Sequence, residues 1–174
     1  MSAGVTQFRE RLHHASAPVE PRTVLIVDDE EGVRSLLSRW LEASGYRVRM
    51  ATNADAALTV FDDEPPALML CDIRMPGRDG LWLAARVRQD FPETAVIMSS
   101  GVQDAHAADE CLRHGVVEYL TKPFGSERLR DAVNRGVEWH EAASEARRWK
   151  RQLEAELRER RSHLLRTVRG LSIE

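Results

Sequence analysis

The stretch that decides the fold is Val24-Leu25-Ile26-Val27-Asp28-Asp29, in which four consecutive apolar residues end in two acidic ones. A second apolar stretch ends at acid in Leu70-Cys71-Asp72, and a third segment ends at a lysine in Thr121-Lys122-Pro123-Phe124. Continuous apolar runs are typical of parallel strands buried on both faces, and parallel sheets bind ligands beyond the carboxyl ends of their strands. The sequence therefore predicts one site at three strand ends, suited to a divalent cation and a phosphoryl group held on an aspartate.

Strand and helix patterns alternate from residue 22 to about residue 138. Right-handed crossovers between parallel strands leave few possible topologies. We predict an α/β fold, a flavodoxin-like doubly wound five-stranded parallel sheet of order 2-1-3-4-5, which brings Asp28, Asp29 and Asp72 together. The expected strands are 24–27, 46–50, 67–71, 95–99 and 116–120, and the expected helices are 32–43, 54–61, 81–89, 104–114 and one that begins at Ser126.

The chain divides into three parts by pattern. Residues 1–21 are expected to be a flexible leader, residues 22–138 the α/β domain, and residues 139–174 an extended helix. We interpret the extension as a coiled coil with a stutter that joins two copies of the chain. The alternative is a lone amphipathic helix folded back on the domain. The apolar positions are Trp139, Ala142, Ala146, Trp149 and Leu153 at three- and four-residue spacing, then Leu157, Leu164 and Leu171 at seven-residue spacing.

Composition excludes several classes of protein. The formal net charge of -3 predicts no general attraction to nucleic acid or to anionic membranes. The sequence shows neither a signal peptide nor an apolar stretch of the roughly 20 residues that span a bilayer, so we expect a cytoplasmic protein. Cys71 and Cys111 lack metal-ligand spacing and are expected to be buried thiols in a reducing compartment. All six histidines are interpreted as surface residues.

Residues 22 to about 138 resemble the receiver domain of two-component response regulators. The resemblance covers about two-thirds of the chain, and its motifs follow the order and spacing of that family. They are the Asp28-Asp29 pair after the first strand, the stretch Cys-Asp-Ile-Arg-Met-Pro-Gly-Arg-Asp-Gly at 71–80, Ser100-Gly101, Tyr119, and Lys122-Pro123-Phe124.

The resemblance implies that Asp72 accepts a phosphoryl group from a sensor histidine kinase. It implies Mg²⁺ as cofactor, held by Asp28, Asp29, Asp72 and the backbone carbonyl of Arg74, with Lys122 binding a phosphoryl oxygen. A carboxylate is a weak nucleophile, so the reaction depends on positioning and charge neutralisation. The only catalysis expected is phosphorylation and dephosphorylation of the protein's own aspartate, without turnover of a separate substrate.

The resemblance also implies a switch. The hydroxyl of Ser100 would donate to the phosphoryl group, and Tyr119 would swing inward when that hydroxyl moves; the alternative is that Tyr119 is an ordinary half-buried strand residue. Arg74 and Val102 occupy positions that border the phosphoryl group and influence its lifetime. The change would leave through the face formed by helix 104–114, the fifth strand and the last helix, and then through the extended helix.

Several outputs stay open. The Arg- and Glu-rich extension resembles connectors to output domains such as HD-GYP, so the chain can be a receiver fragment of a larger output enzyme or can act on a separate output partner. A second hypothesis is a DNA-binding transcriptional regulator that uses the basic C-terminal helix. The glutamates interleaved among its arginines and the lack of a recognition motif argue against it. A third is a constitutive scaffold with a vestigial site, against which the full set of site residues argues.

Overall fold

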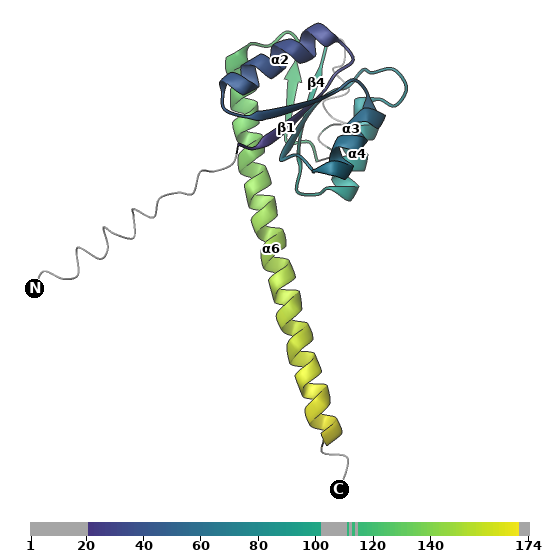
Figure 1. The fold of residues 1–174 in the computed structure, drawn as a ribbon, viewed down its shortest axis with the longest axis vertical. Helices are drawn as coiled ribbons and strands as arrows, with labels where there is room; N and C mark the ends of the chain where they lie inside the picture. Colours follow the sequence, from purple (N-terminus) through teal and green to yellow (C-terminus); the bar gives the residue numbers. More distant parts are fainter. Residues whose placement is uncertain (1–20, 102–110, 112, 114, 171–174) are drawn as a thin grey trace, which may run out of the picture.

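The structure, a computed structural model, describes residues 21–101, 111, 113 and 115–170. Among these residues, the first helix follows the first strand, and one long helix comes last (Figure 1). The elements are β1 (Thr23–Val27), α2 (Glu31–Ala43), β2 (Arg47–Ala51), α3 (Ala54–Asp63), β3 (Leu68–Asp72), α4 (Gly80–Asp90), β4 (Ala95–Ser100), β5 (Glu118–Thr121) and α6 (Ser126–Gly170).

The five strands form one parallel sheet in the order β2-β1-β3-β4-β5, which confirms the predicted fold. Val27 pairs with Cys71, and Asp72 pairs with Ser99. Neighbouring strands therefore end at the same edge of the sheet. The residues that follow β1, β3 and β5 are brought to this edge, where a doubly wound sheet binds its ligands.

Helices cover both faces of the sheet and create two apolar cores. α3 and α4 cover one face, where Phe61 and Leu83 pack on the strands. α2 and α6 cover the other face, where Leu37 and Leu129 are buried. Residues of β1 alternate between the two cores, so all five are buried. This explains why the strand is a continuous apolar run instead of an alternating one.

The observed elements differ from the predicted bounds mainly at their ends. The second strand is Arg47–Ala51 instead of 46–50, because the register pairs Thr23 with Arg47 and Val27 with Ala51. The fifth strand is shorter than predicted and begins at Glu118. The expected helix 104–114 and the leader 1–21 lie almost wholly outside the described residues.

α6 is a single helix of 45 residues, about 70 Å long. Its first turns pack on the sheet, where Gly136 permits close approach: a Cβ there would lie 2.2 Å from Leu68 Cδ1. The helix then leaves the domain and projects away from it (Figure 1), and Trp149 and Leu153 are 65% and 58% exposed. The projecting part is thus not folded back on the domain. Among the described helices, α6 included, none is long and apolar enough to cross a membrane.

Glu93, in the loop between α4 and β4, anchors the base of the projecting helix. Its carboxylate accepts hydrogen bonds from Ser144 (3.1 Å) and Arg151 (3.3 Å) and forms an ion pair with Arg147 (2.8 Å). Its main-chain oxygen accepts a hydrogen bond of 2.6 Å from His140 Nδ1. Residues at this three- and four-residue spacing share one face of a helix. His140, interpreted from the sequence as a surface residue, is half-buried where it contacts this loop.

Replacing Glu93 by alanine should loosen this anchor. We expect amide hydrogen exchange in residues 138–152 to become a few-fold faster while the sheet stays protected, since partly exposed charged hydrogen bonds contribute about 1 kcal/mol together. Exchange followed by mass spectrometry measures this. Glu159→Ala on the exposed part of the same helix is the control. Equal exchange in the two variants would contradict an anchoring role for Glu93.

Candidate functional site

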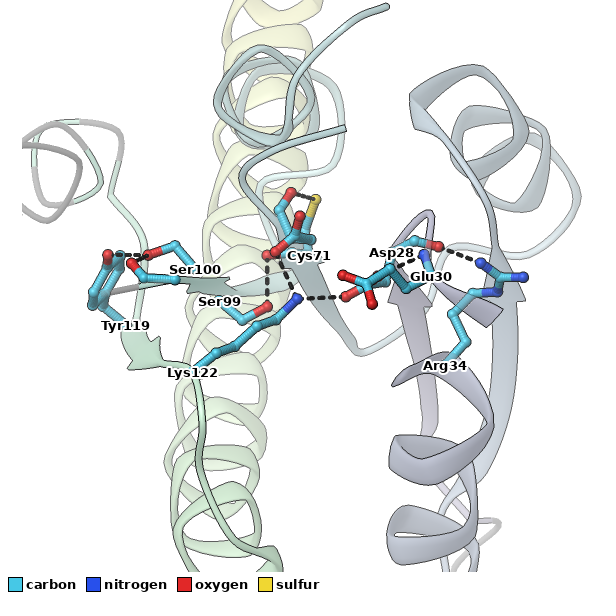
Figure 2. A network of polar contacts seen from close by, with 10 residues as sticks. Asp28, Glu30, Arg34, Cys71, Ser99, Ser100, Tyr119 and Lys122 are labelled. Carbon is cyan, nitrogen blue, oxygen red and sulfur yellow. Dashed lines mark hydrogen bonds and ion pairs between the residues drawn. The ribbon is translucent and has the colours of Figure 1, made fainter. Parts of the chain in front are cut away.

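A single ammonium group joins the ends of three strands. Lys122, which follows β5, places Nζ 2.8 Å from Asp28 Oδ2 and 2.8 Å from Asp72 Oδ1. Figure 2 shows its side chain extended toward Asp28 at the edge of the sheet. Asp28 and Asp72 are 2% and 7% exposed, respectively. Two buried carboxylates therefore share one cation, and these contacts join three of the four side chains that the sequence selects at these strand ends.

The backbone around Asp28 fixes its carboxylate. Asp28 Oδ1 accepts a hydrogen bond of 2.9 Å from the amide of Glu30, at the start of α2. The Asp28 carbonyl accepts one of 2.6 Å from Arg34 Nη1 (Figure 2). One carboxylate oxygen is thus held by the main chain and the other faces Lys122. Asp29, next in the chain, is exposed.

Asp72 is held from behind by the start of α4. The amide of Gly80 donates to the Ile73 carbonyl at 2.9 Å. A Cβ on Gly80 would lie 2.0 Å from the Asp72 carbonyl oxygen, so only glycine fits. Asp79 caps the helix by accepting a hydrogen bond of 2.8 Å from the Trp82 amide. The loop after β3 therefore folds back against the strand end and positions Asp72.

Burial and neighbouring groups shift the pKa of Asp72 and of Lys122. Burial raises the pKa of Asp72, and the charges of Asp28 and Asp29 raise it further, while Lys122 opposes the change. Burial lowers the pKa of Lys122, but its hydrogen bonds to Asp28 and Asp72 outweigh burial and leave this pKa raised. Lys122 is accordingly an ammonium at neutral pH, and the ionised form of Asp72 is less favourable here than in water.

Asp72→Asn should therefore stabilise the fold at neutral pH in Mg²⁺-free buffer. A raised carboxyl pKa means that ionised Asp72 costs stability above that pKa, and that the cost disappears as the pH falls to the ordinary carboxyl range near 4. The urea midpoint of D72N should exceed that of the unmodified chain near pH 8, and the gap should close near pH 4. A gap that stays constant across this range would contradict the assignment.

Ser100 and Tyr119 form a second pair beside the site. The two hydroxyls share a hydrogen bond, and Ser100 Oγ also contacts the Gly101 carbonyl at 3.2 Å (Figure 2). Ser100 is 1% exposed, whereas Tyr119 is half-buried. The Ser100 carbonyl accepts a hydrogen bond of 2.6 Å from the amide of Lys122. The main chain of Ser100 thus connects this pair to the residue that bridges the carboxylates.

The donor chemistry fits Mg²⁺. Asp28, Asp72 and the exposed Asp29 supply hard carboxylate oxygens, which Mg²⁺ prefers, and this ion needs only one or two carboxylates because it keeps several waters. Within the described ranges, no three or more His, Cys, Asp or Glu side chains are gathered closely enough to hold a metal by themselves. Arg74 is exposed, and Val102 lies outside the described residues.

Sequence reasoning missed several residues that support the site. Arg34 and the Glu30 amide hold Asp28 through the main chain, and no sequence pattern signals such contacts. Gly80 had a signal, because it ends a turn-rich loop just before a helix, but its close approach to Asp72 required the fold.

Comparison with known proteins gives the family. Residues 24–134 match the family model described as response regulator receiver domain. The chain is 36% identical over 124 residues to the regulatory protein AtoC of Escherichia coli, an alignment of 71% of this chain and 27% of AtoC. It is 32% identical over 149 residues to the nitrogen assimilation regulatory protein NtrX of Azorhizobium caulinodans, covering 84% of this chain and 33% of NtrX. The chain thus spans a third or less of these relatives.

Solved structures agree with the sequence relatives. The receiver domain of NtrX from Brucella abortus superposes with a TM-score of 0.64 and 35% identity, covering 66% of this chain and 98% of that domain. A CheY-like receiver domain protein from Methanospirillum hungatei gives a TM-score of 0.67 at 26% identity, covering 70% of this chain and 98% of its own. Asp28, Asp72 and Lys122 all lie within residues 24–134, the range that the family model matches. The chain therefore belongs to the response regulator receiver family of two-component systems.

Proposed function

We propose that this receiver accepts a phosphoryl group on Asp72 from a sensor histidine kinase, with Mg²⁺ as cofactor. The observation that carries the proposal is the Lys122 ammonium held 2.8 Å from both Asp28 and Asp72, two carboxylates that are almost fully buried. A cation held between two buried carboxylates can neutralise the further negative charge that a phosphoryl group would bring. Perturbed titratable groups of this kind are typical of functional sites.

Each residue of the site has a specific role in the proposed phosphoryl transfer. An oxygen of Asp72 attacks phosphorus, one O–P bond forms, and the N–P bond of the kinase phosphohistidine breaks as the imidazole leaves. Lys122 stays charged and binds a phosphoryl oxygen. Asp28, Asp29, Asp72 and the Arg74 carbonyl would hold Mg²⁺, which supplies further charge neutralisation when bound. The raised pKa of Asp72 is consistent with a carboxylate that gains from added positive charge.

The signal is proposed to pass from Asp72 to Ser100 and Tyr119. A phosphoryl oxygen would compete with the Gly101 carbonyl for the proton of the Ser100 hydroxyl, and the Ser100–Tyr119 hydrogen bond would change with it. Tyr119 lies on β5, which pairs with β4 and contacts α6. The conformational change would reach the face formed by the expected helix 104–114, β5 and α6, as a population shift between two states of the domain.

The extended part of α6 is proposed to pair with a second copy of the chain. Its apolar side chains Trp149, Leu153, Leu157 and Leu164 are 57–65% exposed, and an isolated helix this polar gains little stability alone.

We propose a division into leader 1–21, receiver 22–138 and helix 139–174. The chain spans a third or less of the length of the curated relatives. We therefore propose that an output domain or a separate output partner produces the response, and we expect the protein to act in the cytoplasm.

DNA binding by the C-terminal helix is the weaker alternative. A relative from Salmonella typhimurium is named a DNA-binding transcriptional regulator, but only 26% of its length aligns with this chain. In α6 the arginines alternate with glutamates, as in the ion pair of 3.7 Å between Arg158 and Glu154. A mixed face of this kind offers no basic stripe for a phosphate backbone.

The test of the phosphorylation proposal uses the whole chain and acetyl phosphate as donor. With Mg²⁺ present, intact mass spectrometry should show the addition of one phosphoryl group, and EDTA should suppress it, because the buried carboxylates need a second cation to accept more charge. Ca²⁺, which prefers more ligands and longer bonds, is the control ion and should support less modification. Equal modification with Mg²⁺ and with EDTA would contradict the proposal.

A further inference from the structure

The projecting part of α6 has two distinct faces. His140, Ser144, Arg147 and Arg151 hold Glu93 and define the face toward the domain. At 100° per residue, the apolar positions cluster within about 80°, and their centre lies about 150° from this anchored face. The apolar face therefore points away from the receiver. Its members are Ala142, Ala146, Trp149, Leu153, Leu157 and Leu164, all exposed.

The apolar face repeats every eleven residues. Ala142, Leu153 and Leu164 are eleven apart, and so are Ala146 and Leu157. A repeat of eleven residues in three turns is about 3.67 residues per turn, slightly more than the 3.6 of an α-helix. A heptad pattern with one stutter describes the same residues, but the eleven-residue repeat needs no interruption. Helices paired through it run nearly straight or with a slight right-handed supercoil.

Opposite charges flank this face. Glu145 and Glu156 lie on one side, and Lys150 and Arg161 lie on the other, each base five residues after an acid. The two acidic residues are eleven residues apart, and so are the two basic residues. All four are exposed, and within the described ranges none makes an ion pair. The charges that border the apolar face are thus available to a partner helix.

We infer that a second copy of this chain covers the face in a parallel, in-register arrangement; this rests on the proposed dimer. When two identical helices run parallel, the acidic flank of one meets the basic flank of the other, so Glu145 faces the partner's Lys150 and Glu156 faces the partner's Arg161. When they run antiparallel, acid meets acid and base meets base. Charge complementarity therefore favours the parallel dimer, in which each of these two ion pairs forms twice, once from each chain.

Arg160 lies within the apolar face, eleven residues after Trp149. In a parallel in-register dimer, Arg160 meets the partner's Arg160 in one layer. A basic residue at one seam position lowers stability while it restricts register. Arg160→Leu should accordingly tighten the dimer by at least about tenfold, as measured by sedimentation equilibrium. An unchanged or weaker dimer would overturn the in-register arrangement.

Disulfide formation in the full chain tests the orientation. Cys71 and Cys111 are buried, so an added surface cysteine is the reactive one. A parallel dimer predicts that Ala146→Cys and Leu164→Cys each form a covalent dimer with themselves on mild oxidation. Ala155→Cys, on the opposite side of the helix, is the control and should stay monomeric on a non-reducing gel. Crosslinking only between A146C and L164C chains would overturn the parallel arrangement.

Charge reversal gives an independent readout. The E145K/E156K chain should dimerise at least about tenfold more weakly, because attractive pairs become repulsive. Reversing all four residues, in E145K/K150E/E156K/R161E, should restore the original affinity. If the double variant matches the unmodified chain, the flank pairing is wrong while the dimer stands. If light scattering finds the unmodified chain monomeric at high concentration, the proposed dimer itself fails.

Discussion

Asp72→Asn should abolish phosphoryl uptake from acetyl phosphate. The amide that replaces the carboxylate has no anionic oxygen to attack phosphorus, whereas its size matches the buried position beside Lys122. The expected result is one added phosphoryl group on the unmodified chain and none on D72N, measured by intact mass spectrometry with Mg²⁺ present. The neighbouring carboxylate of Asp28 is not expected to replace Asp72, because it is already held by the Glu30 amide and Lys122.

The control for this experiment is Asp62→Asn. Asp62 is an exposed aspartate of α3. D62N should take up the phosphoryl group as the unmodified chain does, and D72N should keep the same circular dichroism spectrum as both. Normal uptake by D72N would assign the acceptor to another residue and would contradict the proposed function.

Gly80→Ala should produce the largest loss of stability of any single methyl addition in the site. The added Cβ would lie 2.0 Å from the Asp72 carbonyl oxygen, 2.9 Å from its carbon and 3.0 Å from Ile73 Cα, and backbone atoms cannot rotate away. Overpacking of this kind costs typically up to about 3 kcal/mol. We expect a fall of roughly 10 °C in the unfolding temperature, measured by calorimetry. Since the clash pushes on Asp72 itself, phosphoryl uptake should slow as well.

The control for Gly80→Ala is Gly32→Ala. A Cβ on Gly32, in the first turn of α2, would meet no atom within 4 Å. Alanine in a helix is more favourable than glycine by up to about 1 kcal/mol, so G32A should be as stable as the original chain or more stable. If G80A and G32A unfold at the same temperature, the close approach of α4 to β3 does not constrain position 80.

The sequence by itself determined the fold and the strand ends that carry the site. Val24–Val27 is apolar at every position because β1 is buried on both faces, and such a run is readable without any structure. Asp28 and Asp72 each stand where an apolar run stops, and in a doubly wound sheet strands one and three are neighbours. Their proximity follows from local pattern and general topology.

Only the tertiary structure decided how distant parts of the chain meet. Lys122 reaches Asp28 across 94 residues and Asp72 across 50, and its placement depends on β5 pairing with β4. The anchoring of α6 by Glu93 likewise joins residues 47 to 58 apart, so helical periodicity does not report it. Periodicity records which face of an element is apolar, because burial acts on each residue separately. Which charged groups meet depends on where the packed elements place them, and this is a property of the whole fold.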